Sequence, residues 1–372
     1  YFPKINTEYD SIEGTIKLYN NQVFIADNIK EVIPEFLMLL KGVIDCPDLP
    51  LNVSRSALQN DGFVRKISDY ITKKVADKLT GMCKTDRESY EKYWDDISPF
   101  IKFGCIKDHK FGEKMGDYIL YKDINGKYLT IQDLAAKKED AAKETKESET
   151  SAETSETADA ADSASEKTKE PEKTTVYYVT DEIQQSQYIN MFREAGLDAV
   201  ILKHNIDSAF ITHMEQLRDD LKFQRIDADV TDTFKEETDE DALKETADTL
   251  TEVFRKALGK DKLTVKVEKL KNANVSSMMT LSEENRRMQE MMKMYGMYGM
   301  DPSMFGNEET LVLNANNKLV QYVAAHKDSE HVPMICEQLY DLAMLAHKTL
   351  NPDEMTKFIA RSNEILMLLA MS

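Results

Sequence analysis

Arg55 stands in a setting that suits contact with a phosphate group. It lies at the predicted start of a helix, after a loop stiffened by two prolines, and Asn52 and Gln59 are close by in the sequence. A helix N-terminus offers free N–H groups and the positive end of the helix dipole, and the planar guanidinium fork of arginine matches phosphate oxygens. The spacing alone leaves a simpler interpretation open, in which Ser54 caps the helix and Arg55 is a solvated residue of its first turn.

A methionine-rich stretch is the second feature that could bind a partner. Nine of the 19 methionines lie in residues 278–304, and Met288, Met291 and Met292 stand among basic and polar residues. Methionine is flexible and polarizable, so clusters of it suit surfaces that bind varied apolar partners. Core packing is the alternative, because a methionine stripe at helical spacing is most often buried. The glycines that flank this stretch loosen it and favour the first interpretation.

Two predicted helices at the end of the chain carry apolar stripes. One covers residues 330–350, and the next begins at Asn351-Pro352-Asp353, where proline suits a first turn. Two adjacent amphipathic helices need an apolar surface to pack on, which is either an earlier part of this chain or a second copy of the helices. The residues expected on these stripes include Leu339, Leu342, Phe358, Ile365, Leu366 and Leu369.

The elements that must position Arg55 form a predicted mixture of strands and helices. Runs of β-forming residues and apolar residues at helical spacing mark these elements. Trp94 falls on the apolar stripe of one helix, where a core position is more probable than a ligand platform. The predicted elements are strands at 16–19 and 23–25, a short helix at 34–40, a buried strand at 43–45, helices at 54–82 and 90–103, and a strand at 128–131.

Residues 135–173 differ in kind from the rest of the chain. The central run is made of Glu, Asp, Ser, Thr and Ala, without aromatic or branched aliphatic residues. Such a segment cannot bury enough apolar surface to offset the entropy of ordering, so it is predicted to be disordered. A regulatory or solubilising role stays open beside a tolerated surface insertion, and we favour the insertion because lengthening a loop costs little free energy.

Residues 176–226 predict a small parallel sheet. Apolar strands at 176–179, 199–202 and 222–226 alternate with helices that we expect Asp181 and Asp207 to cap. No glycine-rich phosphate-binding motif follows the first two strands, which argues against a nucleotide-binding unit. A helix at 239–258, ended by Gly259, and a half-exposed strand at 262–270 follow.

Composition limits the partners of the chain. Its 372 residues suffice for two or three domains, and 67 acidic against 48 basic residues give a net charge of -19. Such a chain is repelled by nucleic acids and anionic membranes, and no apolar run approaches the roughly 18 residues of a membrane span. His326 and His331 do not share a helix face, so we expect no metal site. The four cysteines are far apart, as in a protein with reduced thiols: Cys46, Cys83, Cys105 and Cys336.

Two runs of the sequence resemble a known family. They are residues 16–28, IKLYNNQVFIADN, and residues 43–55, VIDCPDLPLNVSR. Both are similar to the middle domain of the heat-shock protein 90 (Hsp90) family of molecular chaperones, particularly its bacterial members. The resemblance implies that Arg55 reaches the γ-phosphate of ATP across a domain boundary, with Asn52 and Gln59 in the same catalytic loop. Ser56 departs from the acidic residue that usually follows this arginine, which puts the supporting contacts of the loop in doubt.

The resemblance implies an α+β or α/β multidomain protein that lacks its N-terminal part. The expected domains are the large α/β part of the middle domain at 1–134, the acidic insert at 135–173, a small parallel β-α-β-α-β subdomain at 174–232, and a helix-rich C-terminal dimerisation domain at 233–372. ATP and Mg²⁺ would be bound mainly by the missing domain. We therefore expect ATP hydrolysis of the full-length protein and no cofactor in this chain alone.

The family also implies partners. Met288, Met291 and Met292 would contact unfolded client proteins in the cleft of a homodimer, and the two C-terminal helices would form a four-helix bundle with those of a second copy. The last residues lack the acidic motif that recruits helical-repeat co-chaperones in eukaryotic relatives. The expectation is thus a cytoplasmic stress-response chaperone. The alternatives are an ATP-independent dimeric protein-binding scaffold and, more weakly supported, a hydrolase that acts through its own α/β region.

Overall fold

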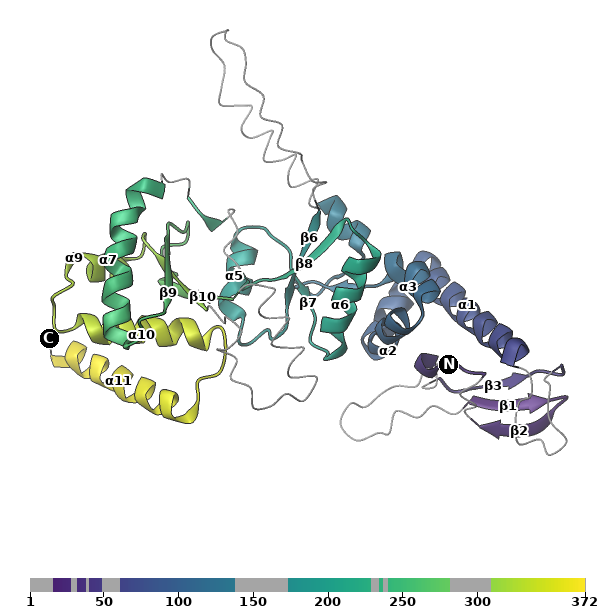
Figure 1. The fold of residues 1–372 in the computed structure, drawn as a ribbon. Helices are drawn as coiled ribbons and strands as arrows, with labels where there is room; N and C mark the ends of the chain where they lie inside the picture. The colour runs from purple at the N-terminus through teal and green to yellow at the C-terminus, as the bar shows by residue number, and fades with distance from the viewer. Residues whose placement is uncertain are drawn as a thin grey trace, which may run out of the picture. The chain divides into compact units, whose positions relative to one another are not determined.

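A computed structural model describes residues 16–27, 32–37, 40–48, 61–137, 173–228, 234–236, 240–281 and 309–371 (Figure 1). The chain divides into two compact units, one of Tyr1–Thr174 with His204–Lys222 and the other of Thr175–Lys203 with Phe223–Ser372. Helices and small sheets occur in both units, which confirms the predicted α+β class. The predicted domain limits stay predictions.

A three-stranded sheet opens the first unit. Strand β1 (Ile16–Asn20) lies between β2 (Val23–Asp27), its antiparallel neighbour, and β3 (Gly42–Asp45), its parallel neighbour. Asn21 and Gln22 connect β1 to β2 with φ of 47° and 64°, the left-handed pair that a tight hairpin turn requires. The prediction of a buried strand at 43–45 is wrong in its burial. Val43 is 67% exposed because β3 is an outer strand of this sheet.

Helices α1 (Asp61–Thr85), α2 (Arg87–Lys107) and α3 (His109–Met115) form the core of the first unit. Trp94 is buried on α2, as predicted. Gly104 of α2 allows a close approach, since a Cβ there would lie 2.6 Å from the ring of Phe36. Phe36 belongs to a short 3-10 helix, η1 (Glu35–Leu37), and its ring centroid lies 4.9 Å from that of Phe111 on α3. Residues 51–60, where the helix was predicted to start, lie outside the described part of the chain.

A buried ion pair fastens α6 (Ile206–Leu217) to α2. Lys102 donates to the carboxylate of Asp207, and the side chains of both are about 95% buried. Burial alone would raise the pKa of Asp207, but hydrogen bonds from His204 and the charge of Lys102 outweigh it and lower that pKa. Asp207 was predicted to cap this helix. It instead lies inside the first turn, because its carboxylate is used by the His204 backbone N–H and by Lys102.

A two-stranded antiparallel sheet of β4 (Tyr121–Lys122) and β5 (Tyr128–Leu129) comes next, and it is followed by a small three-stranded sheet with the strand order β7-β6-β8. Its strands are β6 (Thr174–Val179), β7 (Val200–Ile201) and β8 (Leu221–Arg225), and the pairing of β6 with β7 is parallel, as predicted. Helix α5 (Ser186–Glu194) follows β6 but starts later than predicted. The side chains of Asp181 and Gln185 accept backbone N–H groups of residues 180–184, which holds this segment in a turn before the helix begins.

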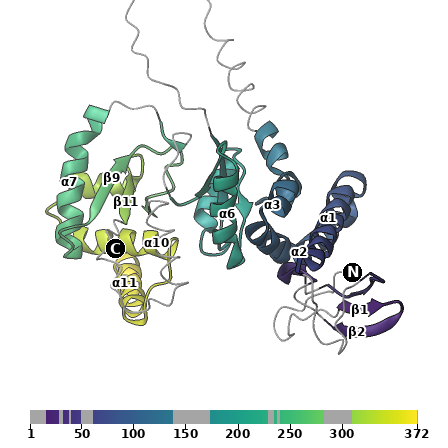
Figure 2. The same cartoon turned by 45° about the vertical axis from the view of Figure 1, so that its right-hand side comes forward.

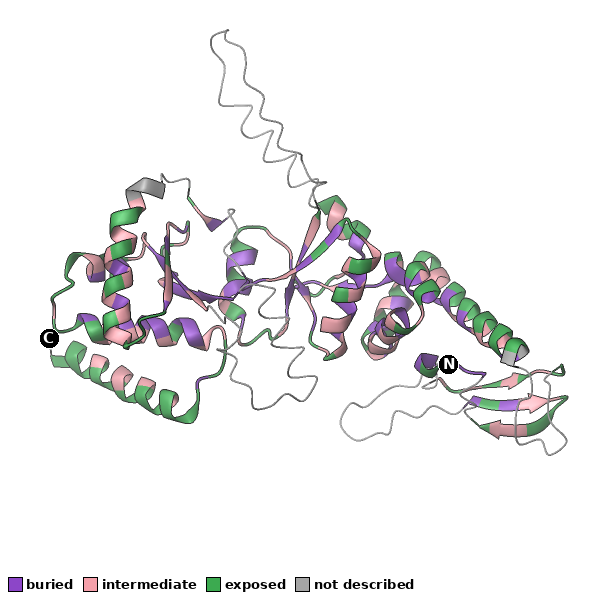
Figure 3. Cartoon of the chain, in the orientation of Figure 1, coloured by how far each residue is buried: buried purple, intermediate pink, exposed green. Residues whose placement is uncertain are grey.

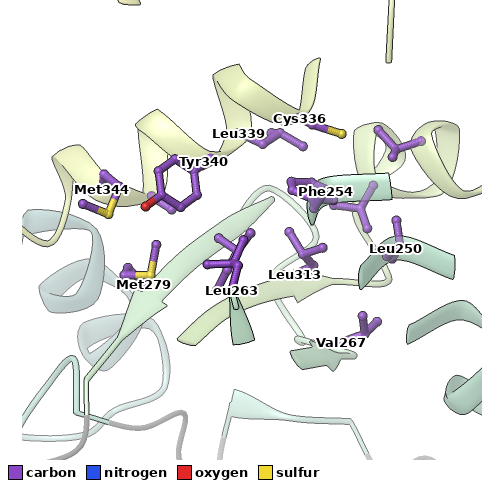
Figure 4. Packing of buried hydrophobic residues seen from close by; sticks show 14 of the residues in the cluster. Leu250, Phe254, Leu263, Val267, Met279, Leu313, Cys336, Leu339, Tyr340 and Met344 are labelled. Carbon is purple, nitrogen blue, oxygen red and sulfur yellow. The ribbon is translucent and has the colours of Figure 1, made fainter. Parts of the chain in front are cut away.

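The end of the chain builds a further three-stranded sheet covered by helices. Strand β11 (Thr310–Asn314) lies between β10 (Ser277–Thr280), which is antiparallel, and β9 (Thr264–Glu268), which is parallel. Helix α7 (Glu240–Leu258) packs on β9, and α10 (Val332–Leu345) packs on both β10 and α7. Helix α9 (Lys318–Ala325) completes the core shown in Figure 4. Gly259 ends α7 with φ of 62°, as predicted.

The last helix, α11 (Pro352–Met371), lies beside α10 in both ribbon views (Figures 1 and 2). The predicted helices at 330–350 and from 351 onward are therefore both present. Helix α10 is shorter than predicted at each end. At its C-terminal end the backbone N–H groups of His347 and Lys348 both donate to the Met344 carbonyl, which closes the last turn.

Candidate functional site

The predicted catalytic positions Arg55, Asn52 and Gln59 lie outside the described residues, as does Ser56. The same holds for Met288, Met291 and Met292. Their roles stay predictions. The structure describes the frame on both sides of residues 49–60 and the surface formed by the last two helices.

A side-chain clamp holds the chain just before the predicted catalytic loop. The Nδ2 of Asn20 donates to the carbonyls of Cys46 at 3.0 Å and Pro47 at 3.1 Å, and the backbone N–H of Cys46 donates to the Tyr19 carbonyl at 3.0 Å. Asn20 ends β1, so the clamp fixes the start of the loop to the sheet. The sequence analysis missed Asn20, because nothing in its local pattern separates this role from that of an ordinary turn residue.

Reciprocal capping fixes the start of α11. The Asn351 side chain accepts the Glu354 backbone N–H at 2.9 Å, and the Glu354 carboxylate accepts the Asn351 backbone N–H at 3.0 Å. This is a capping box, and it satisfies two donors that a helix start otherwise leaves unpaired. Pro352 takes the first helical position, where its missing N–H costs nothing. The turn between α10 and α11 is thus set locally by the sequence.

The six residues predicted for dimerisation have different environments. Leu339 is 1% exposed and belongs to the core between α10 and the sheet, so it supports the helix pair from within (Figure 4). Phe358 is partly buried against the same core, and Ile365 is half-buried. Leu342, Leu366 and Leu369 are exposed, with Leu366 at 63% and Leu369 at 68%.

Helix α11 contains no buried residue (Figure 3), although its last seven residues, 365–371, are all apolar. Folded chains seldom leave contiguous apolar surface in water unless it meets a partner. Five large apolar residues join Leu366 in this exposed set, and Met367, Leu368 and Met371 among them were not singled out by the sequence analysis. We call the whole set the α11 apolar surface: Ile359, Leu366, Met367, Leu368, Leu369 and Met371.

A partly buried arginine, and not apolar burial, makes the closest described contacts between α11 and α10. The guanidinium of Arg361 donates to Gln338 at 2.9 Å and Glu337 at 2.8 Å, and it also bonds Asp341. Its side chain is only 10% exposed. A forked guanidinium that meets three acceptors fixes the rotation of the helix as well as its distance. Arg361 was missed because its partners stand 20 to 24 residues away on another helix.

Asp227 ties the turn after α10 to the end of β8. It is fully buried, and its carboxylate accepts from Arg225 at 2.8 Å and lies 3.2 Å from Nδ1 of His347. Burial alone would raise its pKa, but the hydrogen bond from His347 and the ion pair with Arg225 outweigh burial and lower the pKa to about 2. The three residues therefore brace the helix pair against the small sheet within the second unit.

We expect Asp227→Asn to lower the free energy of unfolding of the second unit by about 3 kcal/mol at pH 7, because the negative charge that faces Arg225 is lost. The carboxylate has a folded pKa of about 2 against a reference of 3.8, so its stabilisation is present above pH 4 and is lost as the pH falls through 2. The difference between parent and variant should thus shrink by about 2 kcal/mol on acidification.

Urea unfolding followed by circular dichroism at a series of pH values measures this difference. The control is Asp328→Asn, an exposed carboxylate of the same unit, which should change stability by less than about 0.5 kcal/mol. Equal losses for both variants, or a loss independent of pH, would contradict the role given to Asp227.

Comparison with known proteins places this arrangement in a family. The family model described as "Hsp90 protein" matches residues 2–144 and 148–371. The chain belongs to the Hsp90 family. Among its relatives, the chaperone protein HtpG of Bacteroides fragilis is 34% identical over 340 residues, covering 89% of this chain and 46% of the relative. HtpG of Porphyromonas gingivalis is 32% identical over 354 residues, covering 93% and 48%.

The family match also extends to more distant relatives. HtpG of Borrelia garinii is 26% identical over 370 residues, covering 96% of this chain and 53% of the relative. The chain thus spans about half the length of the curated HtpG relatives it matches. The resemblance seen in residues 16–28 and 43–55 is therefore confirmed at the level of the Hsp90 family, including its bacterial members.

Other kinds of site have little support in the described part of this Hsp90 family member. All four cysteines are free thiols, and three of them are buried. Among the described residues, no group of three or more His, Cys, Asp and Glu side chains is arranged to hold a metal ion. Within the same residues, no helix combines the length and apolarity needed to cross a membrane.

Proposed function

We propose that this chain is the middle and C-terminal part of a bacterial Hsp90-type chaperone that binds unfolded or partly folded proteins as a homodimer. The observation that carries the proposal is the family match over nearly the whole chain, together with relatives that are named chaperone proteins. A homodimeric chaperone needs an interface between its two copies. The α11 apolar surface supplies a candidate for it.

The proposed dimer pairs two copies through α11, and through Leu342 of α10. These side chains are exposed although they are apolar, and the capping box and Arg361 hold the helix pair in place without covering them. Two such pairs packed face to face would form a four-helix bundle. The same surface on both copies would meet itself, as a two-fold symmetric interface requires.

We further propose that the complete protein hydrolyses ATP with help from Arg55. The proposal rests on the resemblance of residues 43–55 and on the described clamp from Asn20, which would fix the start of the loop. ATP and Mg²⁺ would supply the phosphoryl group and its counter-charge, bound mainly by a domain that precedes this chain. Arg55 would place a fixed positive charge beside the γ-phosphate, with Asn52 and Gln59 orienting the loop.

The experiment that tests the proposed function measures the aggregation of an unfolding globular protein. The chain is joined to the N-terminal part of an HtpG relative and added with and without ATP. Suppression of aggregation that depends on ATP supports the proposal. Equal suppression with and without ATP would favour the ATP-independent scaffold, and no suppression would overturn both.

Met291→Ser with Met292→Ser is expected to weaken the suppression of aggregation several-fold while leaving ATP hydrolysis intact. Each change removes an apolar contact worth roughly 1–2 kcal/mol if the side chain meets a client. The control is Ile183→Ser, which removes an 88% exposed apolar side chain from a turn elsewhere in the chain. If the methionine pair and Ile183 give the same result with the fold intact, the methionines have no special role.

A further inference from the structure

Two methionines of the α11 apolar surface are open to water. Among the described methionines, only Met367, which is 58% exposed, and Met371, which is 78% exposed, have exposed side chains. Met82, Met334 and Met355 are partly buried. The other described methionines are buried: Met115, Met191, Met214, Met278, Met279 and Met344. The pair on α11 therefore differs from the rest of the described methionines in its access to solutes.

The two methionines lie on the side of α11 that faces away from the core. They are four residues apart, so they stand one turn apart on the same face of the helix. Phe358 marks the opposite side, because it packs against the core of the second unit. Met367 follows Phe358 by nine residues, which places it about 180° further around a helix of 3.6 residues per turn. The fold of one chain therefore leaves both methionines uncovered.

The neighbours of these methionines at the end of α11 are apolar. Residues 365–371 contain no polar side chain, and Leu366, Leu368 and Leu369 among them are exposed. A polar group formed within this run finds no hydrogen-bond donor among the side chains of the run. Burial of a polar group without a hydrogen-bond partner is unfavourable. A change that makes either methionine polar therefore opposes the burial of the whole run.

Oxidation by a peroxide makes this change with a single oxygen atom. The O–O bond of hydrogen peroxide breaks, an S–O bond forms on the thioether sulfur, and the rest of the peroxide leaves as water. The sulfur loses two electrons, and the peroxide gains them. The product, methionine sulfoxide, is polar and chiral. Reductases reverse the reaction, because two thiols supply the two electrons, become a disulfide and release the oxygen as water.

The other sulfur atoms in the described part of the chain are less open to a peroxide. Three of the four cysteines are buried, and the fourth is partly exposed. Burial raises the pKa of the thiols of Cys83, Cys105 and Cys336, which keeps the reactive thiolate scarce. The buried methionines are reached only when the fold opens locally. Among the described residues, Met367 and Met371 are therefore the sulfur-containing side chains that a peroxide reaches first.

We propose that Met367 and Met371 form a reversible oxidation site that controls whether two copies of the chain associate. The inference rests on the proposed homodimer, in which the α11 apolar surface of one copy meets that of the other. Association covers the two methionines, so the peroxide reacts with the free chain, and the sulfoxides then oppose association. Free chains accumulate under oxidising conditions, and the dimer forms again after reduction.

The effect on association is large because a two-fold dimer contains the site twice. Two methionines in each copy give four sulfoxides in the dimer. The loss of one buried methionine contact changes a dissociation constant by about tenfold, given the usual free energy of burying such a side chain. Contacts within one interface are not additive, so the four losses sum to less than their product. We expect the dissociation constant to rise by about 10²-fold or more.

Sedimentation equilibrium of the whole chain before and after treatment with hydrogen peroxide tests the proposal, with peptide mass spectrometry to measure the oxidation of each methionine. The dissociation constant of the parent should rise by about 10²-fold or more, and treatment with reductases for both sulfoxide epimers should restore it. The comparison is Met367→Leu with Met371→Leu, in which leucine is apolar but has no sulfur to oxidise. Peroxide should change the dissociation constant of this variant by less than about twofold.

The outcomes separate this inference from the proposed dimer. An untreated parent that is monomeric at every concentration contradicts the dimer itself. A dimer that does not weaken when Met367 and Met371 are oxidised, that weakens equally in the leucine variant, or whose two methionines resist peroxide overturns the oxidation site and leaves the dimer standing. Met367→Gln with Met371→Gln makes both positions polar without an oxidant. With its circular dichroism unchanged, this variant should dissociate like the oxidised parent, and association as tight as that of the untreated parent would also overturn the inference.

Discussion

Leu366→Asp combined with Leu369→Asp is expected to convert a dimer of this chain into monomers. The two leucines are 63% and 68% exposed on a helix that buries none of its own residues. Full burial of a leucine is worth roughly 1.5–3 kcal/mol. A two-fold interface would bury both leucines of each copy, which makes four side chains in all. The four substituted side chains would thus remove roughly 6 kcal/mol or more, which raises the dissociation constant by about 10⁴-fold.

Sedimentation equilibrium over a range of protein concentrations measures this change. The matched control is Ala360→Asp with Asn363→Asp, which adds the same side chain at two exposed positions of α11 that carry no large apolar group. We expect the control to stay dimeric. A double-leucine variant that also stays dimeric, with its circular dichroism unchanged, would show that the α11 apolar surface has another partner.

The energetics of α11 explain why its apolar surface is available. Helix α11 is held to α10 mainly by the polar Arg361 fork, while the capping box fixes the start of α11 locally. The buried residues of the core belong to the sheet, to α7, α9 and α10 and to the segments between them, and α11 adds only the partly buried Met355 and Phe358. The fold of one chain therefore leaves α11 oriented but uncovered, which is the state expected of a helix whose apolar burial comes from association.

The sequence predicted those parts of the fold that local rules determine. Periodicity located α1, α2, α7 and the final helix pair, and the caps at Gly259 and Pro352 placed two ends correctly. It failed where tertiary contacts override the local rule. Val43 is of a residue type expected in a buried strand, but it is exposed on an outer strand. Asp207 stands where a helix cap was predicted, but its carboxylate binds Lys102 instead.

The candidate site was predictable only in its apolar part. A stripe of leucines is visible in a sequence because helical spacing repeats along one element. The polar contacts that orient the helix pair join residues that are far apart, since 120 positions separate Asp227 from His347. No spacing rule relates such residues. For the same reason the clamp from Asn20 to Cys46 and Pro47 could not be anticipated from β1 alone.

Arg55→Ala, made in the chain joined to the N-terminal part of an HtpG relative, is expected to reduce kcat for ATP hydrolysis on the order of 10²–10³-fold. Removing one fixed donor that stabilises the charge developing on the phosphate has an effect of this size. A water molecule in place of the guanidinium would not be held in the orientation that the transition state requires. Binding of ATP should change little, since the nucleotide would be held mainly by the N-terminal part joined to the chain. The loss should therefore fall on kcat and leave KM within a few-fold of the parent.

The control for this experiment is Arg65→Ala, which removes an exposed arginine from the described part of α1, ten residues after Arg55. Its rate should stay within about twofold, because a solvated cation at that distance is screened. Arg55→Lys separates charge from geometry, since lysine keeps the charge but lacks the planar fork. A partial recovery would indicate that charge is the main contribution, and no recovery would indicate bidentate contact. If Arg55→Ala hydrolyses ATP at the parent rate, the active site is complete without this chain, and the ATP-independent scaffold becomes the better account of what residues 1–372 do.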